Sequence, residues 1–266
     1  MLEGLLAPDA GDIEILGMRW ATHEHALRER LGVALQETKL AERLSVLETL
    51  TLFRSFHQRG HDVDDVIGMV QLGEKRKTWV VKLSGGQKQR LAVACALVSD
   101  PDILFLDEPT TGLDPQSRRQ LWDVVEAFKA GGKSVLLTTH YMDEAERLCD
   151  RVAVVDHGKT IALGSPRDLI ASLGAEHVVE FEIGGRAAAE ERVAADAAWL
   201  GALPGVTDAR HERGRWMLTV TELHRAVPAL MGGLAERGIA LADLRTHHAT
   251  LEDLFLHLTG RHLRDE

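Results

Sequence analysis

The sequence is short of cysteine and of long apolar runs, and each shortage excludes a class of protein. The two cysteines, Cys95 and Cys149, are too few for a disulfide scaffold or a cysteine-only zinc site, and they suit a reducing cytoplasm. The longest uninterrupted apolar run covers residues 91–98, whereas a membrane-spanning helix needs about 20 residues. No basic stretch followed by an apolar core begins the chain, so no secretory signal is visible. We therefore expect any membrane role to depend on a partner.

Charge and composition are those of an ordinary globular protein. The chain has 31 Lys and Arg against 41 Asp and Glu, and its formal net charge of −10 argues against a nucleic-acid-binding surface. With 45% hydrophobic and 27% charged residues, it is neither disordered nor collagen-like. A length of 266 residues allows one or two domains with a sizeable core.

Strand and helix patterns alternate through the first part of the chain. Apolar runs or period-two alternation predict the strands, and apolar periodicity with N-capping residues predicts the helices. Such alternation is typical of an α/β fold with a parallel sheet covered on both faces. Strands are predicted at residues 12–16, 31–35, 102–106, 134–138 and 151–155, and helices at residues 46–58, 63–72, 84–98, 115–129 and 142–149.

The composition changes after about residue 173. The following 90 or so residues mix strand and helix patterns, which indicates a small α+β appendage. We therefore expect two domains, residues 1–173 and residues 174–266. Within the second domain, helices are predicted at residues 187–198, 223–237 and 251–258, and a strand at residues 215–220.

The segment Ser84-Gly85-Gly86-Gln87 begins a predicted helix and carries the strongest functional signal. Ser84 and Gln87 have the spacing of a capping box, which needs no function. Two adjacent glycines inside a helix start are costly, at roughly 1 kcal/mol each against alanine. Bare backbone N–H groups at a helix N-terminus can approach an anion closely, so the glycines favour an anion-binding role.

Carboxylates and other polar side chains follow the predicted strands. Asp107 and Glu108 come directly after an apolar strand, where ligands bind in open α/β sheets, and such a pair can divide the support of Mg²⁺ from the polarisation of a water. An ordinary strand end is the other interpretation. Gln36 and His140 also follow strands, and Asp114 before a proline is explained by helix capping alone.

Taken together, these pieces closely resemble the nucleotide-binding subunit of ATP-binding-cassette (ABC) transporters over about residues 1–170. The order and spacing are specific, although each piece alone is not. The matches are Gln36 with the Q-loop glutamine, residues 83–87 with the family signature, residues 104–108 with the Walker B strand and its adjacent glutamate, residues 112–114 with the D-loop, and His140 with the switch histidine.

The resemblance implies a P-loop NTPase-like fold and a role for each matching residue. In that family, two such domains sandwich two ATP molecules with Mg²⁺. Glu108 would be the general base or water-orienting group, His140 would contact the γ-phosphate, and the signature would bind ATP held by the opposite subunit. The implied catalytic residues are Glu108 and His140, the nucleotide-binding residues are Gln36, Ser84, Gly85, Gly86, Gln87, Asp107 and Asp114, and the Mg²⁺ ligands are Asp107 and Gln36.

One family motif is missing from the sequence, the phosphate-binding loop G-x-x-x-x-G-K-[ST]. Gly132-Lys133-Ser134 is similar to the last residues of this motif, but it precedes a predicted strand. Gly131 and Gly132 are better explained as the C-terminal end of the predicted helix before it. The core is thus expected to be N-terminally truncated. Two explanations stay open: the loop is encoded upstream of Met1, or the chain is a degenerate subunit that offers its signature to an intact partner.

The resemblance also implies partners and a location. Residues 250–259 are similar to the last helix of ATPases that serve drug- and antibiotic-exporting ABC transporters. We therefore expect an ATPase that drives export through a transmembrane permease, pairs with a second nucleotide-binding subunit and lies at the cytoplasmic face of the membrane. A non-hydrolysing regulatory partner of an intact ATPase is the alternative. ABC proteins of translation and DNA repair form a third class, which the single cassette without a coiled-coil insertion disfavours.

Overall fold

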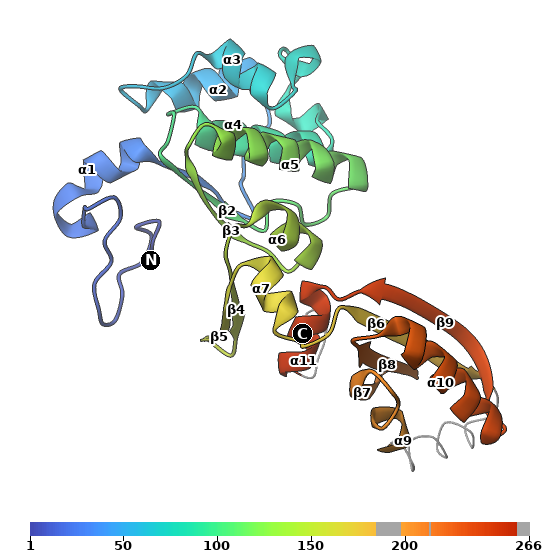
Figure 1. The fold of residues 1–266 in the computed structure, drawn as a ribbon. Coiled ribbons are helices and arrows are strands. Elements are labelled where there is room, and N and C mark those ends of the chain that lie inside the picture. Colours follow the sequence, from blue (N-terminus) through green and yellow to red (C-terminus); the bar gives the residue numbers. More distant parts are fainter. Residues whose placement is uncertain (185–197, 213, 260–266) are drawn as a thin grey trace. The chain divides into compact units, whose positions relative to one another are not determined.

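The computed structural model describes residues 1–184, 198–212 and 214–259, which fall into two compact units, Met1–Glu144 and Ala145–Glu266 (Figure 1). Among those residues, no helix combines the length and the apolar character needed to cross a bilayer.

A parallel three-stranded sheet forms the centre of the first unit. Its strands are β1 (Leu31–Ala34), β2 (Ile103–Asp107) and β3 (Ser134–Thr138), and β2 pairs with β1 on one side and β3 on the other. The apolar residues Leu104 and Leu106 of β2 are buried, as expected for a central parallel strand. The predicted parallel α/β arrangement is confirmed.

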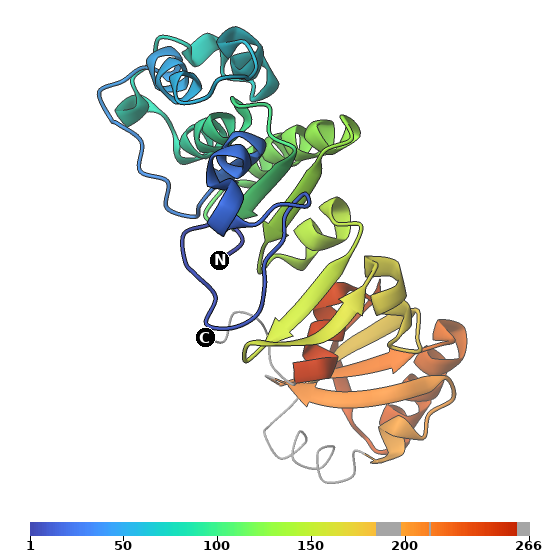
Figure 2. The same cartoon turned by 90° about the vertical axis from the view of Figure 1, so that its left-hand side faces the viewer.

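Helices cover both faces of this sheet, and two successive residues of β1 face different helices. Leu31 packs with Leu27 and Phe105 on one face. A Cβ on Gly32 would lie 2.2 Å from the backbone oxygen of Ala96, which belongs to the helix α4. Only glycine at this position therefore lets α4 approach the other face of the sheet so closely. Figure 2 shows helices on both sides of these strands. The helices of this unit are α1 (Trp20–Arg30), α2 (Val46–Ser55), α3 (Val63–Met69), α4 (Gly85–Leu97) and α5 (Pro115–Ala130), with the 3-10 turns η1 (Gly73–Lys75) and η2 (Val80–Lys82), and α6 (Met142–Leu148) begins at its end.

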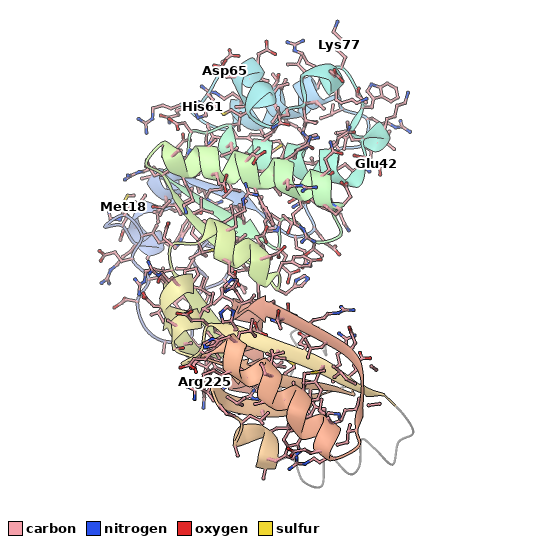
Figure 3. The ribbon with its side chains drawn as sticks, turned by 45° about the vertical axis from the view of Figure 1, so that its right-hand side comes forward. Met18, Glu42, His61, Asp65, Lys77 and Arg225 are labelled. Atoms are coloured by element: carbon pink, nitrogen blue, oxygen red, sulfur yellow. The ribbon has the colours of Figure 1, made fainter. Side chains whose placement is uncertain are left out.

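The helices α2 and α3 pack beside α4 at one end of the first unit (Figure 1). Arg90 of α4 is buried and donates to the backbone oxygens of Val70 (2.9 Å) and Gln71 (3.2 Å), which ties the end of α3 to α4. Burial lowers the pKa of this guanidinium. Asp65 and Lys77 project from the outer side of these helices (Figure 3).

The middle of α4 is core, as its apolar sequence predicts. Cys95 is buried there, and burial raises the pKa of its thiol to about 12. A thiol with such a pKa carries almost no thiolate at neutral pH and is therefore inert.

The predicted strand at residues 12–16 is wrong. Only an isolated bridge between Ile15 and Met18 forms there, because Leu16 (φ 54°) and Gly17 (φ 74°) turn the chain sharply. The alternation of apolar residues has another cause: Ile13 and Ile15 pack on the apolar cluster around Leu27 instead of joining a sheet. The helix α1 that follows was not predicted.

The end of α5 confirms that Gly131 and Gly132 stop a helix. Gly131 is the C-cap and Gly132 has a φ of 77°, a conformation that favours glycine. Lys133 then forms ion pairs with Asp100 (3.0 Å) and Asp102 (3.5 Å) and takes no part in a phosphate loop.

A four-stranded antiparallel sheet in the order β7-β8-β6-β9 forms the core of the second unit. Ala226, Leu230 and Leu234 lie on one face of α10 at helical spacing and are buried in the cluster that covers this sheet. The strands are β6 (His177–Gly184), β7 (Val206–Glu212), β8 (Arg215–Val220) and β9 (Ala240–His248), and the helices are α9 (Ala198–Gly201), α10 (Leu223–Glu236) and α11 (Leu251–Thr259).

The predicted strand at residues 215–220 and the helices at 223–237 and 251–258 are confirmed within a residue or two, whereas β6, β7 and β9 were not predicted. The helix predicted at residues 187–198 lies outside the described residues but for its last one.

Three further elements belong to the second unit, namely a hairpin of β4 (Val152–Asp156) and β5 (Lys159–Gly164) and the helix α7 (Pro166–Ala171). The helix α7 packs on α11, which joins these elements to the rest of the second unit. The domain boundary near residue 173 stays a prediction, since compactness and family domain limits are different criteria.

An ion-pair network at the amino ends of the strands generates a stability prediction. The hydrogen bond from Arg30 to Asp102 (2.5 Å), aided by Lys133, lowers the pKa of that carboxyl, which is 38% exposed. The network therefore stabilises the fold above pH about 4 and is lost as the pH falls through the lowered pKa of the folded state. Because exposed pairs are screened, we expect Asp102→Asn to lower the free energy of unfolding by about 0.5–1 kcal/mol at pH 7.

Urea unfolding at pH 7 and pH 2 measures this contribution. The difference between the wild type and Asp102→Asn should vanish at pH 2, and the exposed Asp9→Asn control should change neither value. An equal loss at both pH values would contradict the ionic origin.

Candidate functional site

Glu108 is the centre of a cluster of polar side chains. Its Oε2 accepts hydrogen bonds from Gln36 Nε2 (3.0 Å) and Thr111 Oγ1 (3.0 Å), and it lies 3.2 Å from His140 Nδ1. The side chains of Glu108 and His140 are 29% and 28% exposed, so water reaches both. A single carboxylate oxygen thus gathers three polar partners at an accessible place.

Strand ends bring this cluster together. Gln36 follows β1, Glu108 follows β2 directly, and His140 follows β3, and these three strands run parallel. Their carboxyl ends therefore meet at one edge of the sheet, where α/β proteins bind ligands. The structure places these three sequence-predicted residues in contact.

The backbone at Glu108 is held in an unusual conformation. Its φ is 44°, a left-handed value that costs a non-glycine residue about 1–3 kcal/mol. Glu108 N donates to the backbone oxygen of Thr138 (3.0 Å) and lies 3.2 Å from its Oγ1, while that hydroxyl donates to Asp107 Oδ1 (2.5 Å). Thr138 thus fixes the Asp107 carboxylate and the backbone of Glu108, and the strain indicates a functional position.

Sequence reasoning missed Thr111 and Thr138. Thr138 could have been found from strand pairing, because it is the direct partner of Asp107 in the β2–β3 register. Thr111 carries no such signal, since only the turn after Glu108 brings its hydroxyl back to the carboxylate.

The contact between His140 and Glu108 constrains the imidazole. A carboxylate oxygen accepts a hydrogen bond from Nδ1 in the ring forms that carry a proton on that nitrogen. The other ring nitrogen, Nε2, then remains for a ligand, as acceptor in the neutral ring and as donor in the doubly protonated ring. This arrangement pairs a water-accessible carboxylate with a histidine that can contact a second group.

The sequence-predicted signature forms the N-terminus of α4. Ser84 Oγ accepts from Gln87 N (3.3 Å), and Gln87 Oε1 accepts from Ser84 N (3.0 Å), which confirms the capping box. Gly85 and Gly86 occupy the first two helical positions, whose backbone N–H groups have no partner within the helix. The polar side chains therefore cap the helix, and the glycine N–H groups are the ones able to meet an anion.

The two glycines have different reasons to lack a side chain. A Cβ on Gly86 would lie 2.4 Å from Ser117 Oγ and 2.6 Å from Ser117 Cβ, so close packing on α5 requires glycine. A Cβ on Gly85 would meet no atom within 4 Å. Packing thus explains Gly86, while Gly85 faces open space where a ligand could approach.

Asp114 lies beside the signature through Ser117. It caps α5 by accepting from Gln116 N (3.0 Å) and Ser117 N (3.0 Å), and Ser117 Oγ donates to its Oδ2 (2.6 Å). These hydrogen bonds, first of all that of the Ser117 hydroxyl, lower the pKa of Asp114. Among the described residues, no hydrogen bond or ion pair joins this signature cluster to the Glu108 cluster. The sequence-predicted site residues therefore form two groups.

A divalent cation would find only part of its ligands in the Glu108 cluster. In the described part of the chain, no three His, Cys, Asp or Glu side chains gather as a ready metal site. Mg²⁺ is commonly held by one or two carboxylates together with substrate phosphates. One oxygen of Asp107 accepts from Thr138, and Gln36 uses its amide nitrogen on Glu108. The second Asp107 oxygen and the Gln36 Oε1 fit such a cation bound with phosphate.

The signature geometry generates a prediction about stability. We expect Gly86→Ala to lower the free energy of unfolding by about 1–3 kcal/mol, because the new methyl group overlaps Ser117. Gly85→Ala is the matched control, and it should leave stability unchanged or raise it by up to about 1 kcal/mol. Urea unfolding measures both values, and the double variant Gly86→Ala/Ser117→Gly should recover most of the loss. Equal effects of the two alanines would contradict this packing.

Comparisons with known proteins agree with this geometry. The family profile described as ABC transporter matches residues 1–111. The Daunorubicin resistance ATP-binding protein DrrA3 of Streptomyces coeruleorubidus is 36% identical over 271 residues, covering 98% of this chain and 82% of the relative. The Nod factor export ATP-binding protein I of Ralstonia nicotianae is 38% identical over 272 residues, covering 100% and 81%.

Solved structures show the same fold. One, described as the ATP binding subunit of an ABC transporter, is 27% identical with a TM-score of 0.58, covering 65% of this chain and 74% of that chain. Another is cbiO1 from Clostridium perfringens, described as part of the ABC transporter complex cbiONQ, which is 28% identical with a TM-score of 0.57, covering 65% and 72%. The predicted P-loop NTPase-like fold is thereby confirmed. The chain belongs to the ABC transporter family of ATPases, among its exporter-type ATP-binding proteins.

Proposed function

We propose that this chain couples ATP hydrolysis to export, with Glu108 as the group that activates the attacking water. The observation that carries the proposal is the convergence of Gln36, Thr111 and His140 on one oxygen of Glu108. Two hydrogen bonds and the nearby imidazole hold this oxygen in place, while the partial exposure of the side chain leaves it accessible to water. A fixed carboxylate that reaches water is what general-base catalysis requires.

The neighbours of Glu108 take the other roles. His140 holds Glu108 through Nδ1 and presents Nε2 to the γ-phosphate. Asp107 and Gln36 supply oxygen ligands to Mg²⁺, which neutralises phosphate charge when bound. Thr138 holds Asp107 and the backbone of Glu108 in one orientation. These residues therefore prepare one half of a phosphate-cleaving site.

The signature supplies the other half to a second subunit. Gly85 offers its backbone N–H at a helix N-terminus with open space beside it, which suits a phosphate of ATP held by a partner. Ser84 and Gln87 keep that terminus in shape, and Asp114 fixes the adjacent start of α5. The separation of the two clusters within one chain supports action across a dimer.

A transmembrane permease completes the proposed assembly. The names of the relatives refer to drug resistance and to export, and one structural neighbour is part of a transporter complex. We infer that this chain binds a permease at the cytoplasmic face of the membrane, and that the permease supplies the path of the transported compound.

A second candidate function is that of a non-hydrolysing partner. The sequence contains no G-x-x-x-x-G-K-[ST] loop, which in P-loop proteins cradles the phosphates. In this case the chain would contribute only its signature, residues 83–87, and this segment would complete the ATP-binding site of an intact subunit. The DNA upstream of the Met1 codon provides a first test, since an in-frame loop there favours the enzyme and a nearby stop codon favours the partner role.

Glu108→Gln tests the first candidate. We expect the variant to lose Mg²⁺-dependent ATP hydrolysis by about 10²–10⁴-fold, because the amide cannot take a proton from water, while ATP binding stays within about twofold. Hydrolysis is measured with the chain extended at its N-terminus to include a phosphate-binding loop, alone and mixed with a complete ABC ATP-binding subunit from its own organism. The exposed Glu74→Gln is the matched control and should behave like the wild type. Unchanged turnover in Glu108→Gln would contradict the assigned base.

Gly85→Glu separates the two candidates in the same mixture. A glutamate in the first turn favours the helix and finds room there, so the unfolding free energy should not fall. Its negative charge should repel phosphate and reduce hydrolysis at least tenfold in both candidates. Loss in Gly85→Glu together with no loss in Glu108→Gln identifies the partner role.

A further inference from the structure

The single tyrosine of the chain contacts the histidine of the Glu108 cluster. The ring centroids of Tyr141 and His140 lie 4.2 Å apart, with their planes tilted by 38°. The guanidinium carbon of Arg118 lies 4.3 Å from the centroid of the same tyrosine ring. A cation is attracted to an aromatic face, and a tightly placed ring restricts the rotation of its neighbour. Arg118, Tyr141 and His140 thus form a continuous row of contacts that ends at Glu108.

Arg118 is itself held in place on α5. Its Nη1 lies 3.3 Å from Asp143 Oδ2, and its side chain is only 21% exposed. Its Nε is buried and has no hydrogen-bond partner among the described residues. The tyrosine ring and Asp143 are therefore the groups that determine where this guanidinium lies.

A second contact with α5 holds the segment that contains His140. Trp122 of α5 donates through Nε1 to Glu144 Oε1 (2.8 Å), and Glu144 is fully buried. Within the turn, Tyr141 N donates to Thr139 Oγ1 (2.9 Å). The backbone around His140 is thus fixed by α5, and the orientation of its imidazole depends on its side-chain contacts with Glu108 and Tyr141.

We propose that Tyr141 and Arg118 are positioning residues that hold the His140 imidazole with Nδ1 toward Glu108. The contact row accounts for this function because Arg118 holds the tyrosine ring, and the tyrosine ring restricts the rotation of the imidazole without any bound ligand. The inference deepens the proposed hydrolytic role of His140 and rests on it for its effect on turnover. Its structural part, the orientation of the imidazole, stands independently.

Nuclear magnetic resonance of the full chain labelled with ¹⁵N-histidine tests the orientation directly. The signals of His140 are identified by their loss in His140→Gln, and the ring nitrogens report which one carries the proton. We expect Tyr141→Leu to reduce the Nδ1-protonated form and to move these signals, whereas Tyr141→Phe, which keeps the ring, should leave that form populated. Unchanged tautomer and signals in Tyr141→Leu overturn the inference.

Arg118 provides a second variant that leaves the tyrosine in place. Arg118→Met removes the cation but keeps an apolar side chain of similar length, and we expect a change in the His140 signals of the same direction. Arg118→Lys, which keeps the positive charge, should restore part of the wild-type signal. Circular dichroism shows whether Tyr141→Leu folds. If it does not fold, Arg118→Met tests the inference by itself, and an unmoved His140 signal in Arg118→Met overturns it.

Hydrolysis in the mixture described above distinguishes this inference from the proposed function. We expect Tyr141→Leu to lower kcat about tenfold with an unchanged KM for ATP, because a misplaced group loses rate without losing substrate binding. Tyr141→Phe should keep wild-type turnover. If the His140 signals move in Tyr141→Leu but His140→Gln hydrolyses normally, the hydrolytic role of His140 fails while the positioning by Tyr141 is upheld.

Discussion

The parallel pairing of β2 between β1 and β3 is the constraint on which the site depends. Because all three strands end at one edge, two side chains distant in sequence, Gln36 and His140, reach Glu108. The carboxylate projects from a strained residue, and Thr138 on the neighbouring strand holds it there. The register of a single sheet therefore determines which distant side chains can reach Glu108.

The opposite end of the same strands carries the charges that hold the register. Arg30 binds Asp102 at the start of β2, and Lys133, just before β3, binds Asp102 and Asp100. These pairs are partly exposed, so each adds little stability alone. Their position matters more, because they join the beginnings of all three strands whose ends carry the site.

Sequence reasoning predicted the parallel core, Glu108 itself and two of the three groups that meet at it, Gln36 and His140, since strand ends and motif spacing are local features. It could not predict Thr111, whose place depends on the turn after Glu108, or α1, whose polar sequence hides the packing of Leu27 on Phe105. It also predicted a strand at residues 12–16 where none forms. The alternation of polar and apolar residues shows which side chains are buried, but it does not show whether the backbone pairs with another strand. The sequence could not show that Gly86 is required by packing and Gly85 is not, because this difference depends on the position of Ser117 on another helix.

The helix α5 carries neighbouring residues that face different parts of the protein. Ser117 packs on Gly86 of the signature helix, and Arg118, the next residue, contacts the tyrosine beside His140. A rigid helix cannot rotate one of these residues and leave the other still. Any movement of α5 would consequently shift the start of the signature helix and the imidazole together, so that this helix links two groups of side chains that share no hydrogen bond in the described part of the chain.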